Sequence, residues 1–212
     1  MDLIKKGAEA NILLEKRNGE KIVLKNRIQK KYRVPQLDFV IRDARTKEET
    51  KLITSARKAG VPTPIIFEID RKNTTIVMQY IEGERLKELI EKLSSNQRAE
   101  ICEKVGQQIG KLHNSKIIHG DLTTSNMIYS SGCIYFIDFG LGHFSQDIED
   151  QGVDLLLLKR VFLSTHYKFS DEAFDAVLKG YREVLGGKAE AIINRIKEIE
   201  ARARYVVERV TR

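Results

Sequence analysis

Residues 118–126 have the sequence Ile-His-Gly-Asp-Leu-Thr-Thr-Ser-Asn, and Asp138-Phe139-Gly140 begins twelve residues after Asn126. A carboxylate such as that of Asp121 can orient a hydroxyl group or a water molecule and accept its proton. Asn126 offers a neutral carbonyl oxygen and Asp138 an anionic one, and oxygen atoms of both kinds are ligands of Mg²⁺. We therefore predict a site in which Asp121 is the base and Asn126 and Asp138 hold the metal ion.

These two stretches occur in the order and at the spacing of a protein-kinase-like catalytic loop followed by a magnesium-binding Asp. Such a site also needs a lysine on an upstream strand, and Lys25 follows the apolar residues 22–24. In the kinase pattern this lysine holds the α- and β-phosphates of ATP. It pairs with a carboxylate of the next helix, and the candidates are Glu48 and Glu49. We choose Glu49 because it shares a helix face with the apolar residues that follow it.

A turn that covers the phosphates of ATP is expected between the first two strands. Residues 6–10, Lys-Gly-Ala-Glu-Ala, lie in that place, with one glycine where the kinase pattern has three. A single glycine predicts a less flexible loop, and Ala8 and Ala10 are small enough to let the backbone approach the phosphates. The ATP-binding residues that we assign to this region are Ile4, Gly7, Ala8, Glu9, Ala10 and Ile12.

The first part of the chain reads mainly as strands. Residues 10–14 and 21–26 are β-prone and flank Asn18-Gly19, a dipeptide that favours a type I′ hairpin turn. Apolar residues recur at helical spacing over residues 37–59, and two further strands are expected at 65–69 and 75–80.

The second part of the chain reads mainly as helices. Ser94 and Gln97 have the spacing of a capping box at a helix start. Residues 153–163 predict a buried helix, and 171–185 and 188–210 predict two amphipathic helices. We predict an α+β, two-lobed protein-kinase-like fold. It would have a β-rich N-lobe at 1–82 and a helical C-lobe at 83–212, together forming one domain.

Residues 78–81 lie where the character of the chain changes from strands to helices. In a kinase this segment is the hinge that binds the adenine ring of ATP. We expect the backbone of Gln79 and Ile81 to bond the edge of the adenine, with Met78 at the back of the pocket.

Two features of the sequence narrow the class of kinase that it can encode. Gly120 stands where many protein kinases have an Arg that pairs with a phosphorylated activation loop, so regulation of that kind is not expected. Only sixteen residues separate Asp138 from Asp154, which leaves no room for a long activation segment or a shelf for an extended peptide. Asp154 itself could cap the helix at 153–163 or hold the catalytic loop.

Composition and charge exclude several other classes of protein. The 212 residues carry a formal net charge of +7, and residues 1–33 alone hold ten Lys or Arg against four Asp or Glu. This basic stretch is either a solvated face or a surface for phosphate-rich ligands or nucleic acid. Cys102 and Cys133 are too few for a disulfide scaffold and predict buried, reduced thiols in a cytoplasmic protein. The sequence contains no apolar run that is long enough to cross a membrane, and no membrane partner is expected.

Several motifs together carry a resemblance to a known family over nearly the whole chain. They are Gly7-Ala8-Glu9-Ala10, Arg45-Thr46 with Glu49, residues 59–64, Met78 with Glu82-Gly83, His119–Asn126, Ile137–Gly142, Asp150 with Val153-Asp154-Leu155, and Ser164-Thr165-His166. In this combination the chain resembles the small atypical kinase subunit of the KEOPS complex, in its short archaeal form.

The resemblance implies a role in threonylcarbamoyladenosine modification of tRNA, with ATP and Mg²⁺ as cofactors. It implies ATPase activity and an atypical serine/threonine kinase activity. It also implies two partners, a glycoprotease-like catalytic subunit and a small regulatory subunit. By motif, Asp121 is the base, Lys25 and Glu49 position the phosphates, and Asn126 and Asp138 are the metal ligands. The family's basic C-terminal tail, which is linked to tRNA, differs here at residues 203–212, so the basic N-terminal third could substitute for it.

Three rival functions remain at this stage. A small-molecule kinase of the aminoglycoside or choline type shares the His-Gly-Asp motif, but the short, basic C-terminal part argues against it. A non-catalytic pseudokinase would serve as a scaffold. Direct nucleic-acid binding is suggested by the basic first third and predicts an affinity for tRNA that depends steeply on salt but not on ATP.

Overall fold

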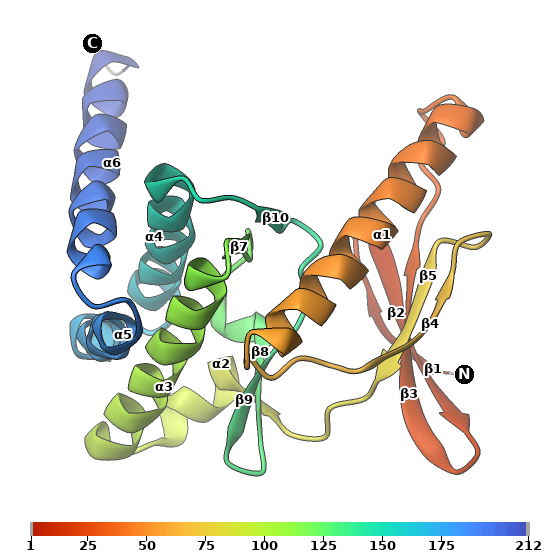
Figure 1. The fold of residues 1–212 in the computed structure, drawn as a ribbon, viewed down its shortest axis with the longest axis horizontal. Coiled ribbons are helices and arrows are strands. Elements are labelled where there is room, and N and C mark those ends of the chain that lie inside the picture. Colours follow the sequence, from red (N-terminus) through yellow and green to blue (C-terminus); the bar gives the residue numbers. More distant parts are fainter. Residues whose placement is uncertain (1, 211–212) are drawn as a thin grey trace.

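The structure, a computed structural model, describes residues 2–210 and the side chains of residues 3–202. Its N-terminal part is a five-stranded antiparallel sheet with the strand order β1-β2-β3-β5-β4 (Figure 1). The strands are β1 (Asp2–Lys6), β2 (Ala10–Arg17), β3 (Glu20–Arg27), β4 (Ile66–Asp70) and β5 (Thr75–Gln79). The sheet lies on one side of the molecule and the helices that follow it lie on the other.

The turn between β2 and β3 fixes the register of the sheet. Asn18 and Gly19 both have positive φ, 54° and 85°, as a type I′ turn requires, so the predicted hairpin is confirmed. This register places Lys25 of β3 between Ile12 of β2 and Ile76 of β5. Because successive side chains of a strand point to opposite faces, Lys25 faces the interior at 5% exposure.

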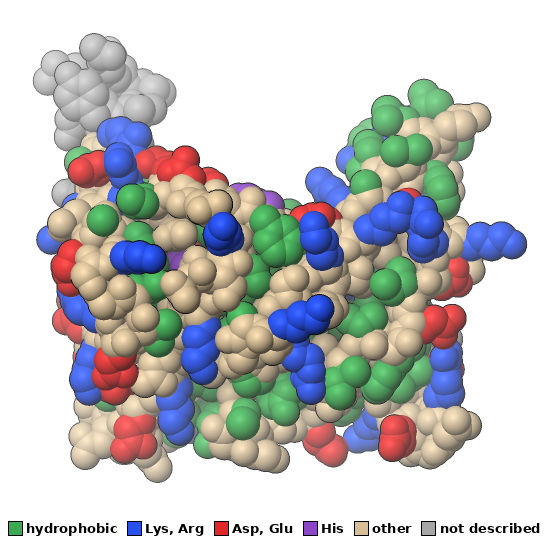
Figure 2. Space-filling model, viewed as in Figure 1, with side chains coloured by type: hydrophobic (Ala, Val, Ile, Leu, Met, Phe, Trp, Pro, Cys, Tyr) green, Lys and Arg blue, Asp and Glu red, His purple; other side chains and the backbone are tan. Residues whose placement is uncertain are grey.

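Helix α1 (Pro35–Lys58) packs against the sheet along one face, from Arg42, which donates to the backbone oxygen of Arg27, to Glu49. Its N-terminal end projects past the sheet, and apolar side chains gather on this projecting end (Figures 1 and 2). Leu37 and Val40 are 55% and 61% exposed there, although the sequence pattern places them on the stripe of the buried Leu52 and Ile53. Their exposure has a simple cause, because the sheet does not reach that end of the helix.

The chain passes from the sheet to the helical part through residues 80–83, which belong to no helix or strand. The proposed lobe boundary at 82 and 83 falls within this connection and stays a prediction. The helices beyond it are α2 (Leu86–Leu89), η1 (Ile90–Lys92), α3 (Ser95–Asn114), η2 (Thr124–Asn126), α4 (Ile148–Thr165), η3 (Tyr167–Phe169), α5 (Ser170–Leu185) and α6 (Lys188–Val210). The predicted capping box of Ser94 and Gln97 is confirmed at the start of α3.

Short strands between the helices carry the residues of the predicted site. β7 (Ile117–Ile118) pairs with β10 (His143–Phe144). A second small sheet contains β6 (Glu84–Arg85), β8 (Met127–Ser130) and β9 (Cys133–Phe136). The catalytic loop therefore lies between β7 and β8, and Asp138 follows β9.

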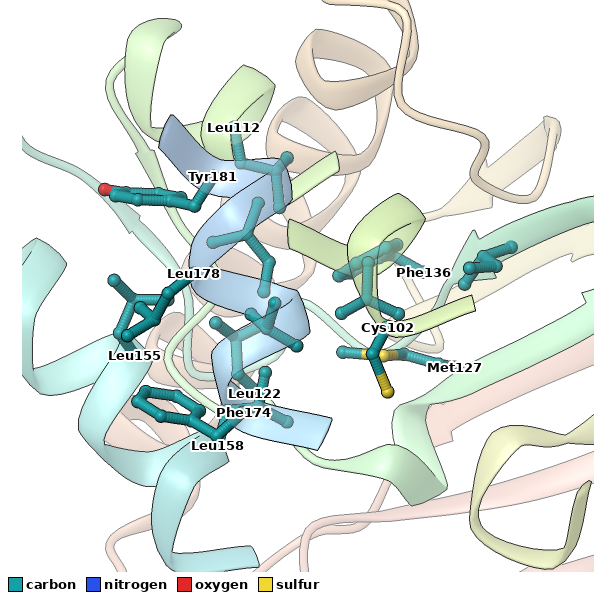
Figure 3. Packing of buried hydrophobic residues seen from close by; sticks show 14 of the residues in the cluster. Cys102, Leu112, Leu122, Met127, Phe136, Leu155, Leu158, Phe174, Leu178 and Tyr181 are labelled. Atoms are coloured by element: carbon teal, nitrogen blue, oxygen red, sulfur yellow. The ribbon is translucent and has the colours of Figure 1, made fainter. Parts of the chain in front are cut away.

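The main core lies among α3, α4 and α5 (Figure 3). Glycines allow α3 and α5 to approach closely, since a Cβ atom at Gly106 would lie 1.9 Å from the carbonyl oxygen of Val177. Cys102 belongs to this core, and burial raises the pKa of its thiol to about 12. Cys133 is exposed, so its predicted burial was wrong; it begins β9 directly after the turn at 131–132, and the side chains that β9 buries are those of Ile134 and Phe136. In residues 2–210, no helix combines the length and the apolar character that a membrane crossing needs.

Candidate active site

A cavity of about 490 Å³ lies between the sheet and the helical part, a volume typical of small-molecule sites. The predicted residues that line it are Ile4, Gly7, Ala8, Glu9, Ala10, Ile12, Lys25, Met78, Gln79, Ile81, Asp121, Asn126 and Asp138. Glu49 is the one predicted site residue outside this lining, and it lies behind Lys25. The structure thus brings the predicted side chains together, and their individual roles remain predictions.

Lys25 connects the two halves of the site. Its Nζ donates to Oε1 of Glu49 at 2.5 Å and to Oδ1 of Asp138 at 2.6 Å. Burial by itself favours the neutral amine, but the charges of Glu49 and Asp138 outweigh burial and raise the pKa of Lys25. Burial likewise opposes ionisation of Asp138, yet the charge of Lys25 lowers the pKa of this carboxyl. Lys25 and Asp138 are therefore both charged at neutral pH.

Asn126 and Asp121 are held in a fixed relation by the short η2 helix. The Nδ2 of Asn126 donates to the backbone oxygen of Asp121 at 3.0 Å and to Oδ2 of Asp121 at 2.8 Å. Because the amide nitrogen is used in this way, the amide oxygen of Asn126 remains available as a ligand.

His119 joins the catalytic loop to the strand that precedes Asp138. The backbone N–H of Asp121 donates to Nδ1 of His119, so Nε2 carries the proton and donates to the oxygen of Ile137 at 3.2 Å. The ring packs on Phe139, with 4.5 Å between ring centroids. Burial lowers the pKa of His119 despite three nearby carboxylates, so the ring is neutral.

Asp154 holds the catalytic loop rather than capping a helix. Its two carboxylate oxygens accept the backbone N–H groups of His119 at 2.8 Å and Gly120 at 2.9 Å. The N-cap of α4 is Asp147, because the helix begins earlier than the sequence pattern predicts. The choice between the two functions of Asp154 is thereby settled.

Gly120 has a local structural reason to be glycine. Its φ is +77°, and a Cβ atom there would lie 2.3 Å from the backbone oxygen of Leu141. An Arg at this position cannot be accommodated without moving the segment after Asp138. The absence of the kinase arginine is thus built into the packing of the loop.

The turn over the cavity is tied to the sheet and to α1. The backbone N–H of Gly7 donates to the oxygen of Ala10 at 3.0 Å. The carboxylate of Glu9 forms an ion pair with Arg45, and Lys30 donates to the backbone oxygen of Ala8. These ties support the prediction of a less flexible loop.

The sequence analysis did not identify some of the residues that line the cavity. Those nearest the polar end are Arg27, Ser125, Gly140 and Leu141, and those around the hinge are Val23, Pro64 and Tyr80. Arg27 had a detectable signal, because it lies two residues after Lys25 and a strand has a side-chain period of two.

The oxygen ligands that the site offers suit a hard cation that also keeps water or phosphate ligands. Asn126 and Asp138 supply oxygen atoms, and no cluster of three or more His, Cys, Asp or Glu residues suited to a metal ion occurs in the described part of the chain. Mg²⁺ is commonly bound by one or two protein oxygens together with phosphates and water. The residues present therefore fit Mg²⁺ bound together with a nucleotide.

Comparison with known proteins identifies the family of the chain. The RIO domain family model matches residues 13–151. The KEOPS complex subunit Bud32 of Pyrococcus abyssi is 52% identical over 97% of this chain and 96% of its own length. A probable bifunctional tRNA threonylcarbamoyladenosine biosynthesis protein of Methanothermobacter thermautotrophicus is 44% identical. The match spans 96% of this chain but only 36% of that longer protein.

A solved structure shows the same fold. It is that of the Rio2 kinase-ADP/Mg²⁺-phosphoaspartate complex from Chaetomium thermophilum, with a TM-score of 0.65 at 16% identity. The likeness covers 93% of this chain and 70% of the other. The two-lobed, kinase-like prediction is thereby confirmed.

The fold, the cavity between the two parts and the match to the RIO domain are together those of an atypical kinase. More narrowly, the chain belongs to the RIO domain family and, within it, to the group of the KEOPS complex subunit Bud32.

Proposed function

We propose that this chain transfers the γ-phosphoryl group of Mg-ATP, to water or to a Ser/Thr hydroxyl, as part of tRNA threonylcarbamoyladenosine synthesis. The observation that carries the chemistry is the chain of contacts from Glu49 through Lys25 to Asp138 at the floor of the cavity. The names of the relatives, a KEOPS subunit and threonylcarbamoyladenosine biosynthesis proteins, support the biological role.

When bound, Mg-ATP supplies the transferable phosphoryl group and the divalent charge. Lys25, held by Glu49, positions the α- and β-phosphates, while Asn126 and Asp138 offer oxygen ligands to the cation. Asp121 orients the attacking hydroxyl or water and accepts its proton at Oδ1, because Oδ2 is already bonded to Asn126. Catalysis then depends on positioning and charge neutralisation rather than on a covalent step of the protein.

The remaining lining residues serve the nucleotide. The turn from Gly7 to Ala10 covers the phosphates, and Ile4 and Ile12 flank it. At the other end of the cavity, the backbone of Gln79 and Ile81 binds the adenine edge in front of Met78.

The proposed partners are a glycoprotease-like catalytic subunit, a small regulatory subunit and, through the complex, tRNA. The chain spans about a third of the length of the bifunctional relatives, at 36%. The additional length of those relatives supports our proposal that a second protein component works together with this chain. The C-terminal side chains at 203–212 lie outside the described residues, so the tail stays a prediction.

The test follows the γ-phosphate. The purified chain is incubated with Mg²⁺ and γ-labelled ATP, alone and with the glycoprotease-like subunit and tRNA. We expect free phosphate that increases with subunit and tRNA and is lost in Asp121→Asn. Asp150→Asn is the matched control, because Asp150 pairs with His143 on the surface, outside the cavity. Label on protein indicates a kinase whose acceptor must be found, and no transfer in any mixture favours a pseudokinase scaffold.

A further inference from the structure

A second cation lies beside Lys25 in the same cavity. Arg27 is the next residue of β3 that faces the interior, its side chain is 4% exposed, and it contributes to the cavity lining. Its Nη2 donates to Oε2 of Glu49 at 2.5 Å, while Lys25 uses Oε1 of the same carboxylate. Glu49 therefore holds two cations, one on each oxygen.

The guanidinium of Arg27 has donors to spare. Its Nε is buried and has no hydrogen-bond partner, and its Nη1 is 3.8 Å from Oε2 of Glu9. A buried N–H group without an acceptor is unfavourable, and a guanidinium presents its donors in a fork that matches phosphate oxygens. The donor group next to the open space is Nη2, 3.5 Å from where a Cβ atom of Gly140 would lie, and besides the N–H bonded to Glu49 it carries a second N–H that suits an anionic ligand.

The two cations meet at one point of the cavity. A Cβ atom at Gly140 would lie 3.1 Å from Oδ1 of Asp138, 3.3 Å from Nζ of Lys25 and 3.5 Å from Nη2 of Arg27. Glycine leaves this position without a side chain, so the three charged groups border the same space.

The charge balance of this floor changes with the proposed function. Lys25 and Arg27 are offset by Glu49 and Asp138 in the structure as described. If Asp138 becomes a metal ligand, the carboxylates left beside Lys25 and Arg27 are Glu49 and the more distant Glu9, which also pairs with Arg45, so the floor gains one positive charge toward phosphates.

We propose that Arg27 is a second phosphate-binding residue, which makes the site selective for nucleoside di- and triphosphates over nucleosides. This proposal rests on the proposed function, because it assumes a nucleotide in the cavity. It assigns Arg27 to the phosphate end and leaves adenine recognition to the hinge.

The test is equilibrium binding to the full chain in Mg²⁺, without turnover. Dissociation constants are measured by calorimetry for AMP-PNP, ADP and adenosine with the wild type, Arg27→Gln and Arg27→Lys. For Arg27→Gln we expect the affinity for AMP-PNP and ADP to fall about tenfold or more, as for a lost charge-assisted contact. The affinity for adenosine should stay within about twofold. Arg27→Lys should recover part of the loss, and it also serves if the Gln variant does not fold.

Arg71→Gln is the matched control, because Arg71 also pairs with a carboxylate, that of Asp43 on α1, but lies outside the cavity and away from the turn that covers it. It should bind all three ligands as the wild type does. An equal loss for adenosine and AMP-PNP in Arg27→Gln, or no loss at all, would overturn the assignment of Arg27 while the wild type still binds AMP-PNP. A wild type that binds no nucleotide would overturn the proposed function itself, and this assignment with it.

Discussion

Lys25 and Asp138 are 113 residues apart in the sequence, and their side chains form an ion pair of 2.6 Å. One residue lies on the sheet and the other follows the small hairpin of the helical part. This contact joins the two halves of the molecule at the floor of the cavity, so the relative position of the halves also sets the geometry of the site.

Replacing Asp138 with Asn tests its role as a metal ligand. The amide keeps the size of the side chain but loses the negative charge that a cation and Lys25 both need. We expect Mg²⁺-dependent phosphate release to fall about a hundredfold or more, a loss typical of removing one electrostatic contact to the transition state. Phosphate release in a steady-state assay measures this. Activity equal to that of Asp150→Asn would show that Asp138 does not bind the metal ion.

Glu49→Gln tests the buried charge network. The substitution removes the negative charge that both Lys25 and Arg27 contact. Breaking a buried ion pair in this way costs about 3–5 kcal/mol of unfolding free energy. Glu48→Gln is the matched control, because Glu48 is half-buried outside this network and should change stability by about 0.5 kcal/mol or less. Urea denaturation measures both. Equal effects of the two substitutions would contradict the assignment.

The pH dependence of stability should reflect His119. Its folded pKa is below the ordinary value of 6.5, mainly because of burial. As pH falls through 6.5, the unfolded chain binds a proton that the folded chain does not. Stability is therefore full above that pH and decreases below it, by at most about 1.4 kcal/mol per pH unit for this group.

Denaturation curves measured at several pH values from about 7.5 to about 5, the range in which histidine titrates, give this change in unfolding free energy. His119→Gln cannot titrate, so its stability should decrease less steeply over the same range. Parallel pH profiles for the wild type and this variant would show that other groups cause the loss.

Gly120→Ala tests the steric account of the catalytic loop. The new Cβ atom meets the oxygen of Leu141 at 2.3 Å in a backbone with φ of +77°. Gly132→Ala is the matched control, since its φ is +83° but nothing lies within 4 Å of a Cβ atom. The control should lose about 1 kcal/mol from the positive φ alone, and Gly120→Ala should lose about 1–3 kcal/mol more. Thermal denaturation with equal losses would refute the steric explanation.

His166 is expected to position the catalytic loop from behind. It is buried, its Nε2 lies 3.0 Å from Oγ1 of Thr124, and its Nδ1 lies 2.5 Å from Oε1 of Glu91. His166→Ala leaves the hydroxyl of Thr124 without this partner and should cost about 1–3 kcal/mol. It should also lower kcat more than it raises KM, with His166→Gln restoring part of kcat. Tyr167→Ala, at a residue that is 69% exposed, is the control. An unchanged kcat would limit His166 to a purely structural role.

Local chemistry made much of the fold readable from the sequence. Asn18-Gly19 specifies its turn because these residues tolerate positive φ, and Ser94 with Gln97 specifies a helix start because both side chains bond the backbone there. The candidate site residues were readable for a related reason. A cation site beside phosphates needs a few fixed residue types at fixed spacing.

Other features depend on segments that the chain brings together from far away. Periodicity placed Leu37 and Val40 on an apolar stripe, but only the extent of the sheet decides that nothing covers them. An apolar run around Cys133 suggested burial, and the packing leaves that residue exposed. A pattern states which residues share a face, and it does not state whether another element lies against that face.

By itself, the sequence determined local features such as the turn at Asn18-Gly19 and the capping box of α3, and it identified Lys25, Asp121 and Asp138 among the charged groups of the cavity. The tertiary structure alone decided that Asp154 holds the loop, that Gly120 lies against Leu141, and that Arg27 shares Glu49 with Lys25. The physical reason is the distance along the chain over which each kind of interaction acts. Backbone conformation and capping act over a few neighbouring residues, whereas ion pairs and steric contacts in the core join residues whose separation no local pattern records.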